Sequence, residues 1–175
     1  MRRILVAIVL SALNAAAPAS AQDSSIVIAS ALGAAPPSIA EHAAVMDWAG
    51  NELRKGTNGW VCFPDPPEME AASMCLDGPW QAWAGAWQNR EPVPIRHAGI
   101  AYMLMGDAGA SNVDPYATGA TADNEWVESG PHLMLIVPDP AALDAFPTDP
   151  ENGGPWVMWK GTPYAHVMIP VIGHH

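Results

Sequence analysis

Alternation of side chains along short apolar segments is the feature that most restricts the fold of this chain. Segments 132–137 and 164–169 have the length and composition of strands, and successive residues of a strand point to opposite faces of its sheet. In the first segment, His132 and Met134 point to one side, and the leucines and the valine point to the other. Segment 97–105 is a third strand candidate, with methionines on one side. The pattern predicts a sheet with one aliphatic face and one face that carries His and Met.

A hairpin near the C-terminus adds further side chains to the second face. The three-residue loop 161–163 separates two strand candidates, and this loop length places Met158 opposite His166 and Trp156 opposite Met168. Side chains of directly opposed residues share a face of the sheet. We therefore expect these four residues to lie together with His132 and Met134, and we call this surface the His/Met/Trp face.

The remaining segments predict the fold class. Segments 43–48, 52–54 and 60–63 read as short strands. Asp77 followed by Pro79 is a helix start, and tryptophans at positions 80, 83 and 87 recur on one helical face. A second, short helix is expected from 140 to 146. We predict an α+β fold, with a mainly antiparallel sheet of about five to six strands and one or two helices packed on it. An all-β roll or barrel is the alternative.

The N-terminal region has the organisation of a secretory signal peptide. Arg2 and Arg3 precede an apolar run of about ten residues, and a small-x-small motif ends at Ala21. The run is too short to span a bilayer. We predict a signal peptide over 1–21, a flexible leader over 22–38 and one globular domain over 39–175, in the periplasm or secreted.

Charge and composition exclude several partners. The chain has a formal net charge of −11, and removal of 21 of its 175 residues would leave 154 residues with a charge of −13. Such an acidic chain repels nucleic acid and anionic lipid. No later apolar run is long enough to cross a membrane. A small molecule or a metal ion remains as the expected partner.

Cys62 and Cys75 are the only cysteines. In an oxidising compartment two cysteines thirteen positions apart favour a disulfide. A thiol nucleophile or a metal-ligand pair is the competing interpretation. The disulfide would close the proline-rich segment 63–68, which has no signal of regular structure.

The His/Met/Trp face carries the candidate site. Thioether and imidazole groups are the ligands that suit copper(I), and imidazole also suits zinc. The competing interpretation is a second apolar core in which Met fills gaps. The candidate metal ligands are His132, Met134, His166, Met168 and His42.

An enzyme is the alternative function. Either His132 or His166 would act as an acid–base group near Tyr164 and Asp47. The common hydrolase, nucleotide-binding, zinc-protease and c-haem motifs are not found in the sequence. A third interpretation is a structural, surface-binding or carbohydrate-binding protein without a catalytic site, because eight tryptophans are many for one small domain.

Four distinctive strings run through the sequence: Thr57–Trp60, Met74–Trp80, His132–Pro140 and Asn152–His166. Together they resemble a group of exported bacterial proteins of uncharacterised function. The resemblance implies a shared fold and export, and it implies no activity. His132-Leu133-Met134 is also similar to the His-x-Met end of periplasmic copper chaperones of the cupredoxin-like type, but the further Met of that family is not found at the expected interval.

Overall fold

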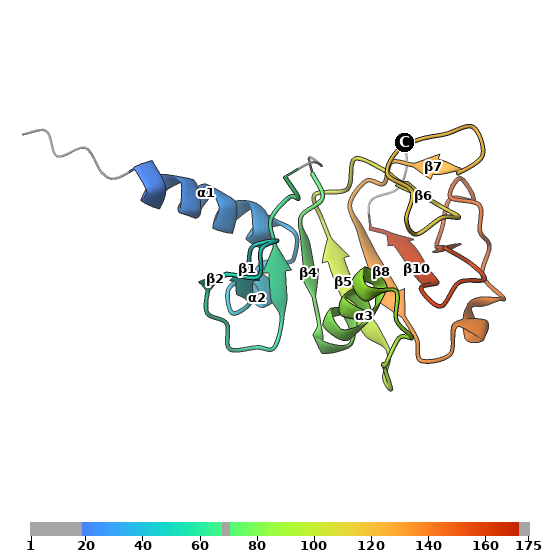
Figure 1. Ribbon diagram of the computed structural model, residues 1–175, viewed down its shortest axis with the longest axis horizontal. Helices are drawn as coiled ribbons and strands as arrows, with labels where there is room; N and C mark the ends of the chain where they lie inside the picture. Colours follow the sequence, from blue (N-terminus) through green and yellow to red (C-terminus); the bar gives the residue numbers. More distant parts are fainter. Residues whose placement is uncertain (1–18, 68–70, 172–175) are drawn as a thin grey trace, which may run out of the picture.

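The computed structural model describes residues 19–67 and 71–171, with side chains from residue 24 onward, as an α+β unit built on one large sheet (Figure 1). The strands of this sheet are, in spatial order, β2 (Glu52–Arg54), β1 (Ala44–Met46), β3 (Val61–Phe63), β4 (Met74–Leu76), β5 (Gly99–Met103), β8 (His132–Ile136), β10 (His166–Pro170) and β9 (Trp156–Met158). A separate two-stranded sheet pairs β6 (Ala110–Ser111) with β7 (Trp126–Val127).

The sheet is mixed but mostly antiparallel. Only β1 and β3 pair in parallel, and every other neighbouring pair runs antiparallel. The predicted α+β class and mainly antiparallel sheet are confirmed. The sheet has eight strands instead of five to six, and it is open, so the alternative of a closed barrel is wrong. Strand β4 was not expected, because its three residues directly precede the helix start at Asp77 and no turn signal separates the two.

The C-terminal hairpin has the register that the loop length predicts. His166 lies opposite Met158 and Met168 lies opposite Trp156. Met168 also pairs with Met134 across β8, so the His/Met/Trp face is continuous over three strands.

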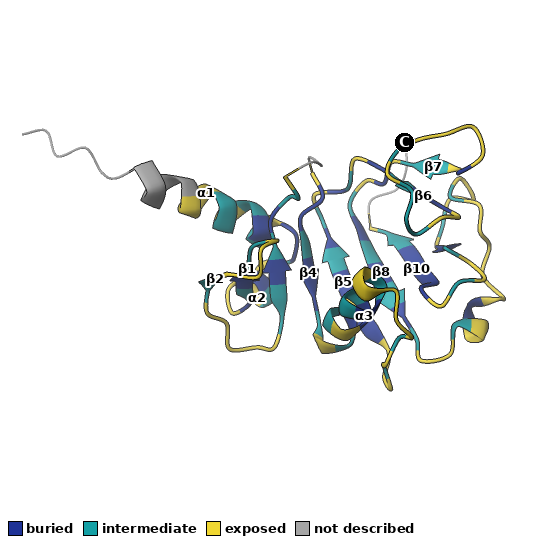
Figure 2. Cartoon of the chain, in the orientation of Figure 1, coloured by how far each residue is buried: buried dark blue, intermediate teal, exposed yellow. Residues whose placement is uncertain are grey.

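Helix α3 (Gly78–Asn89) covers the His/Met/Trp face. The carboxylate of Asp77 caps its first turn by accepting a hydrogen bond from the N–H of Trp80 at 2.9 Å, and its other oxygen accepts one from Ile100 at 2.7 Å. The helix ends at Arg90, which has the left-handed backbone conformation. Trp80 and Trp83 are 2 % and 5 % exposed, so the predicted tryptophan stripe packs in the core. The outer side of α3 is exposed, and the central strands behind it are buried or half-buried (Figure 2).

Replacing Asp77 by Ala should lower the free energy of unfolding by about 1–2 kcal/mol, because a helix cap and a second hydrogen bond are lost together. Asp77→Asn keeps the oxygen that caps the helix, and we expect a clearly smaller loss. Urea unfolding of the two variants measures the difference. Equal losses for Ala and Asn would contradict the capping role.

The opposite face of the sheet is covered at one end by α1 (Ala19–Gly33) and α2 (Pro37–Ala40). Ala31 and Ala34 are fully buried, and the carbonyl of Ala34 accepts a hydrogen bond from the N–H of Leu104 at 3.0 Å. This corrects the expectation of a flexible leader over 22–38: alanine is the strongest helix former, and its small side chain allows close packing on the sheet.

Of the signal peptide predicted over 1–21, all but the last three residues lie outside the described part of the chain, so its cleavage stays a prediction.

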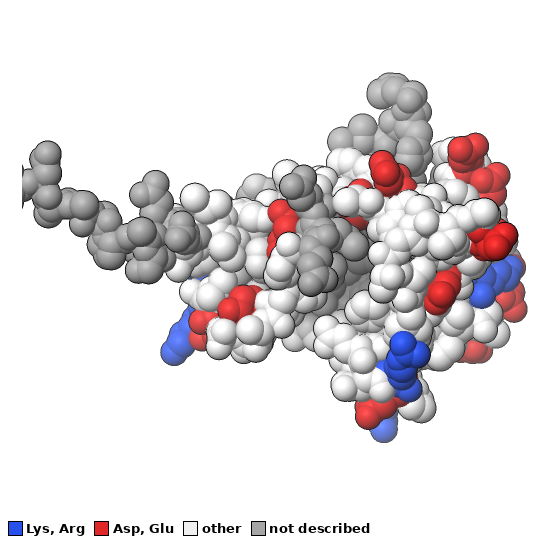
Figure 3. Space-filling model, turned by 45° about the horizontal axis from the view of Figure 1, so that its top comes forward, with Lys and Arg blue, Asp and Glu red and all other residues white. Residues whose placement is uncertain are grey.

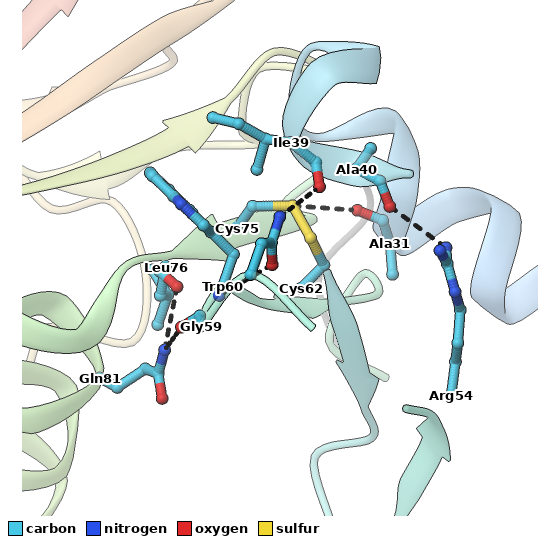
Figure 4. The surroundings of a disulfide bond; sticks show 11 residues. Ala31, Ile39, Ala40, Arg54, Gly59, Trp60, Cys62, Cys75, Leu76 and Gln81 are labelled. Carbon is cyan, nitrogen blue, oxygen red and sulfur yellow. Dashed lines mark hydrogen bonds between the residues drawn. A yellow bond between two sulfur atoms is a disulfide. The ribbon is translucent and has the colours of Figure 1, made fainter. Parts of the chain in front are cut away.

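The predicted disulfide joins Cys62 of β3 to Cys75 of β4. The two residues are directly opposed in the antiparallel pair, both are fully buried, and the carbonyl oxygen of Ala31 lies 3.6 Å from the sulfur of Cys75 (Figure 4). The disulfide therefore lies between the sheet and α1, on the face opposite α3.

Further along this opposite face, Leu143, Val157, Ala165 and Val167 form an aliphatic core. Leu143 belongs to a 3-10 helix, η1 (Pro140–Leu143), which takes the place of the short helix expected from 140 to 146. The expected division into an aliphatic face and a His/Met/Trp face is thus present across β8, β9 and β10.

Candidate functional site

The two histidines of the His/Met/Trp face are buried. His132 and His166 are 1 % and 2 % exposed, and Met134 and Met168 beside them are 8 % and 1 % exposed. Each histidine places its ring Nδ1 near a backbone carbonyl two residues earlier in the chain, at 2.7 Å for His132 and 3.0 Å for His166. A carbonyl only accepts hydrogen bonds, so Nδ1 carries the proton in both rings, and Nε2 of the neutral ring has a free lone pair.

His166 lies in an aromatic cage. Its ring centroid is 4.9 Å from that of Trp159 and 5.6 Å from those of Trp80 and Trp83. Burial in this apolar cage lowers the pKa of His166 to about 4, because the charged ring loses its hydration. The ring is therefore neutral near pH 7, and it fills the core under α3.

Acidification should destabilise the protein through His166. A histidine whose pKa is lower in the folded state binds fewer protons than in the unfolded state between pH 4 and pH 6.5, so stability falls as the pH falls through this window. The pKa of about 4 against the ordinary 6.5 corresponds to about 3 kcal/mol. We expect His166→Gln to lose this part of the pH dependence in urea unfolding, and His97→Gln, at an exposed histidine, to keep it. Identical pH profiles for wild type and His166→Gln would contradict the assignment.

His132 faces a largely buried carboxylate. Its Nε2 lies 3.8 Å from Oδ2 of Asp107 and has no hydrogen-bond partner among the described residues. The other oxygen of Asp107 accepts hydrogen bonds from the backbone N–H groups of Gly109 and Ser129. Burial raises the pKa of Asp107 and lowers the pKa of His132, since both charged forms are poorly hydrated there. A proton on either Asp107 or Nε2 of His132 removes the repulsion between the two facing lone pairs.

A groove of about 430 Å³ opens near this pair, and we call it the Trp126–Trp156 groove. It is lined by Trp126, Val127, Glu128, Pro150, Glu151, Gly153 and Trp156. Glu128 precedes Ser129, which donates to Asp107, and its negative charge contributes to the raised pKa of Asp107. Trp156 is 1 % exposed, and its indole N–H has no partner in the described part of the chain. The groove is thus lined by two carboxylates and two tryptophans, of which Trp156 is almost fully covered and keeps one unused buried donor.

Some of the predicted site residues do not join this region. His42 is exposed and precedes β1, and Asp47 follows β1; three strands separate β1 from β8. The carboxylate of Asp47 accepts hydrogen bonds from Ala49 and Asn51, which lower its pKa. The hydroxyl of Tyr164 donates to the carbonyl of Glu91 at 3.1 Å. Asp47 therefore lies at the other end of the sheet from His132 and His166. The predicted catalytic group of a histidine, Tyr164 and Asp47 is not brought together.

In the sequence, Asp107 and Glu128 are two of several acidic residues in the polar segment 106–130, and nothing marks Ser129. The local signal was weak: Asp107 is followed two residues later by Gly109, whose N–H it accepts, as in many loops. These residues come together because segment 106–130 folds back to the start of β8, and the sequence pattern does not show this path.

The possible metal ligands form a small set. In the ranges 19–67 and 71–171 there is no cluster of three or more His, Cys, Asp or Glu side chains that could hold a metal ion. His132 and Asp107 supply two such groups, and Met103 lies directly opposite His132 across β5 and β8. A metal ion here would need thioether ligands or water to complete its coordination.

Comparison with protein-family models, with curated proteins and with solved structures finds no match. Among the described helices, none has the length and apolar character needed to cross a membrane. The fold and the groove define an α+β domain with a buried disulfide and an acidic, tryptophan-lined depression. Its function has to be inferred from these residues and their geometry.

Proposed function

We propose that the protein is an exported binding protein for a small organic cation that also carries an acceptor oxygen. The observation that carries the proposal is the composition of the Trp126–Trp156 groove. Glu128 and Glu151 line it together with the partly exposed ring of Trp126, and no Lys or Arg does. Organic cations bind over indole faces and beside carboxylates. Acidic side chains also outnumber basic ones on the face shown in Figure 3, so the field around the protein attracts cations.

The unpartnered indole N–H of Trp156, a residue that lines the groove, supports an acceptor oxygen on the ligand. The indole N–H of Trp156 is a buried donor without a partner, and an unpaired buried donor costs about 1–3 kcal/mol. A hydroxyl or carboxylate oxygen of the ligand would accept this hydrogen bond. A cation beside Glu128 would also offset the charge that raises the pKa of Asp107. Binding should therefore release protons and strengthen as the pH rises.

Calorimetric titration with choline and with its uncharged isostere 3,3-dimethylbutanol tests the proposal. We expect choline to bind and the isostere to bind at least tenfold more weakly. The double variant Glu128→Gln/Glu151→Gln should lose at least tenfold in choline affinity, and Glu52→Gln, at an exposed acid of β2, should match the wild type. Equal affinities for the two probes, or no binding of choline at millimolar concentration, would overturn the proposal.

A soft metal ion on the His/Met/Trp face is the second candidate, favoured by one observation. Histidines that ligate a metal usually donate their other ring N–H to a carbonyl or a carboxylate, and both His132 and His166 donate Nδ1–H in this way. Copper(I) and zinc titrations of the wild type and of a His132→Ala/His166→Ala variant test it. We expect the wild type to bind a stoichiometric amount of metal and the variant to bind none. The circular dichroism spectra of the two proteins should agree. A metal-free wild type would exclude this candidate.

A further inference from the structure

A second groove lies between α3 and the β1–β3 end of the sheet, well away from the Trp126–Trp156 groove. Its volume is about 290 Å³, close to the lower end of about 300 Å³ for small-molecule pockets. Its walls are strand residues from β1, β3 and β4 and the turn that follows β1, which includes Asp47 and Trp48. The fourth wall is one stripe of α3, made of Gln81, Ala84, Gly85 and Gln88. We call it the Trp48 groove.

Trp48 gives this groove an exposed aromatic surface. It is 37 % exposed, and it is the one tryptophan in the described part of the chain with more than a third of its surface accessible. Its indole N–H donates to the carbonyl of Pro64 at 2.8 Å, and its ring packs on Phe63 with centroids 5.1 Å apart. The ring is therefore held in place without being covered. An aromatic ring fixed in this way presents a preorganised apolar platform.

Polar groups surround the platform on the helix side and the strand side. The amide N–H₂ of Gln81 donates to the carbonyls of Gly59 and Leu76, which leaves its oxygen as an acceptor (Figure 4). The amide of Gln88 is exposed and has no hydrogen bond within the described residues. The hydrogen bonds from Asn51 that lower the pKa of Asp47 keep this carboxylate ionised. Donors and acceptors thus lie around one exposed ring.

The helix stripe also keeps the groove open. A Cβ atom at Gly85 would have no heavy atom within 4 Å, so the space above this residue is empty. Glycine inside a helix costs about 1 kcal/mol relative to alanine, and neither a positive φ nor a close backbone contact requires it here. The small residues Ala84 and Gly85 therefore leave room for a ligand against α3.

We propose that the Trp48 groove binds one sugar unit of a neutral oligosaccharide. The apolar C–H face of a pyranose would stack on the indole of Trp48, and its hydroxyl groups would bond to Gln81, Gln88 and Asp47. No Lys or Arg lines the groove, so an anionic sugar would meet only the carboxylate of Asp47. The groove has no cationic side chain, and it combines the flat ring of Trp48 with several hydrogen-bonding groups. Both properties match an uncharged, polyhydroxylated ligand.

Calorimetry and affinity electrophoresis with cellohexaose, laminarihexaose, maltohexaose and chitohexaose test the proposal. We expect at least one of them to bind, and both Trp48→Ala and Gly85→Leu to weaken its binding at least tenfold. Gly85→Ala should have a much smaller effect than Gly85→Leu because only the longer side chain fills the groove. Phe146→Ala, at an aromatic residue of similar exposure elsewhere, should bind like the wild type.

The test of the sugar site can be distinguished from the test of the organic-cation site. Glu128→Gln/Glu151→Gln should leave oligosaccharide binding unchanged, and Trp48→Ala should leave choline binding unchanged. No binding of any of the four oligosaccharides at millimolar concentration would overturn the proposal. So would unchanged affinity in Trp48→Ala and Gly85→Leu proteins whose circular dichroism spectra match the wild type.

Discussion

Trp83→Ala should lower the free energy of unfolding by about 3–5 kcal/mol, the usual cost of truncating a large aromatic residue in a core. Trp83 is 5 % exposed and lies at the centre of the aromatic cluster under α3. Its ring centroid is 4.5 Å from that of Trp80 and 5.9 Å from that of Trp159, which it stacks on at an interplanar angle of 6°. It also meets Tyr164 and His166 edge to face. Removal leaves a cavity that these rings cannot close without leaving their present packing.

Urea unfolding of the variant measures this effect, and thermal unfolding should show a midpoint lower by roughly 6–20 °C. Trp48→Ala is the matched control, because the same side chain is removed from a partly exposed position. We expect a clearly smaller loss there, limited to the hydrogen bond to Pro64 and the packing on Phe63. Similar losses at positions 83 and 48 would show that the cluster does not form the core described above.

Removal of the disulfide should have the second largest effect. Cys62→Ala/Cys75→Ala should lower the free energy of unfolding by about 3 kcal/mol through the loop-closure entropy of the thirteen-residue separation. Loss of two fully buried sulfur atoms under α1 adds about 1 kcal/mol. Hydrogen exchange should also show that α1 opens more easily, because the carbonyl of Ala31 packs on the sulfur of Cys75.

Wild-type protein unfolded with and without reductant provides the control. Reduction should reproduce most of the loss seen in the double variant. Equal stability of the oxidised and reduced wild type would contradict a role for the disulfide in stabilising the β3–β4 hairpin.

Much of the sheet could be predicted because its strands carry local signals. The alternation in 132–137 and 164–169 assigned the faces of β8 and β10 correctly, and the loop length assigned the register of the last hairpin. Asp77 with Pro79 similarly marked the start of α3. Strand β4 was missed because it runs directly into the helix start at Asp77. Helix α1 was missed because an alanine-rich segment has no polar face that distinguishes a packed helix from a leader.

The candidate site was only partly predictable. The grouping of His132, Met134, His166 and Met168 follows from side-chain alternation, which is a local property of the chain. Their burial beneath α3 is not local, because it depends on which helix covers which face. The facing of Asp107 and His132 is the clearest case: twenty-five positions separate the residues, and the loop between them returns through β6 and β7.

The sequence by itself determined the local geometry of this protein: the faces of its strands, the start of its main helix, the pairing of its two cysteines and its acidic character. Only the tertiary structure decided that the His/Met/Trp face is buried beneath α3, and that two open grooves lie beside Trp126 and Trp48. The physical reason is that alternation and capping depend on neighbouring residues, whereas burial, pKa and the shape of a groove depend on side chains that the fold brings together from distant segments.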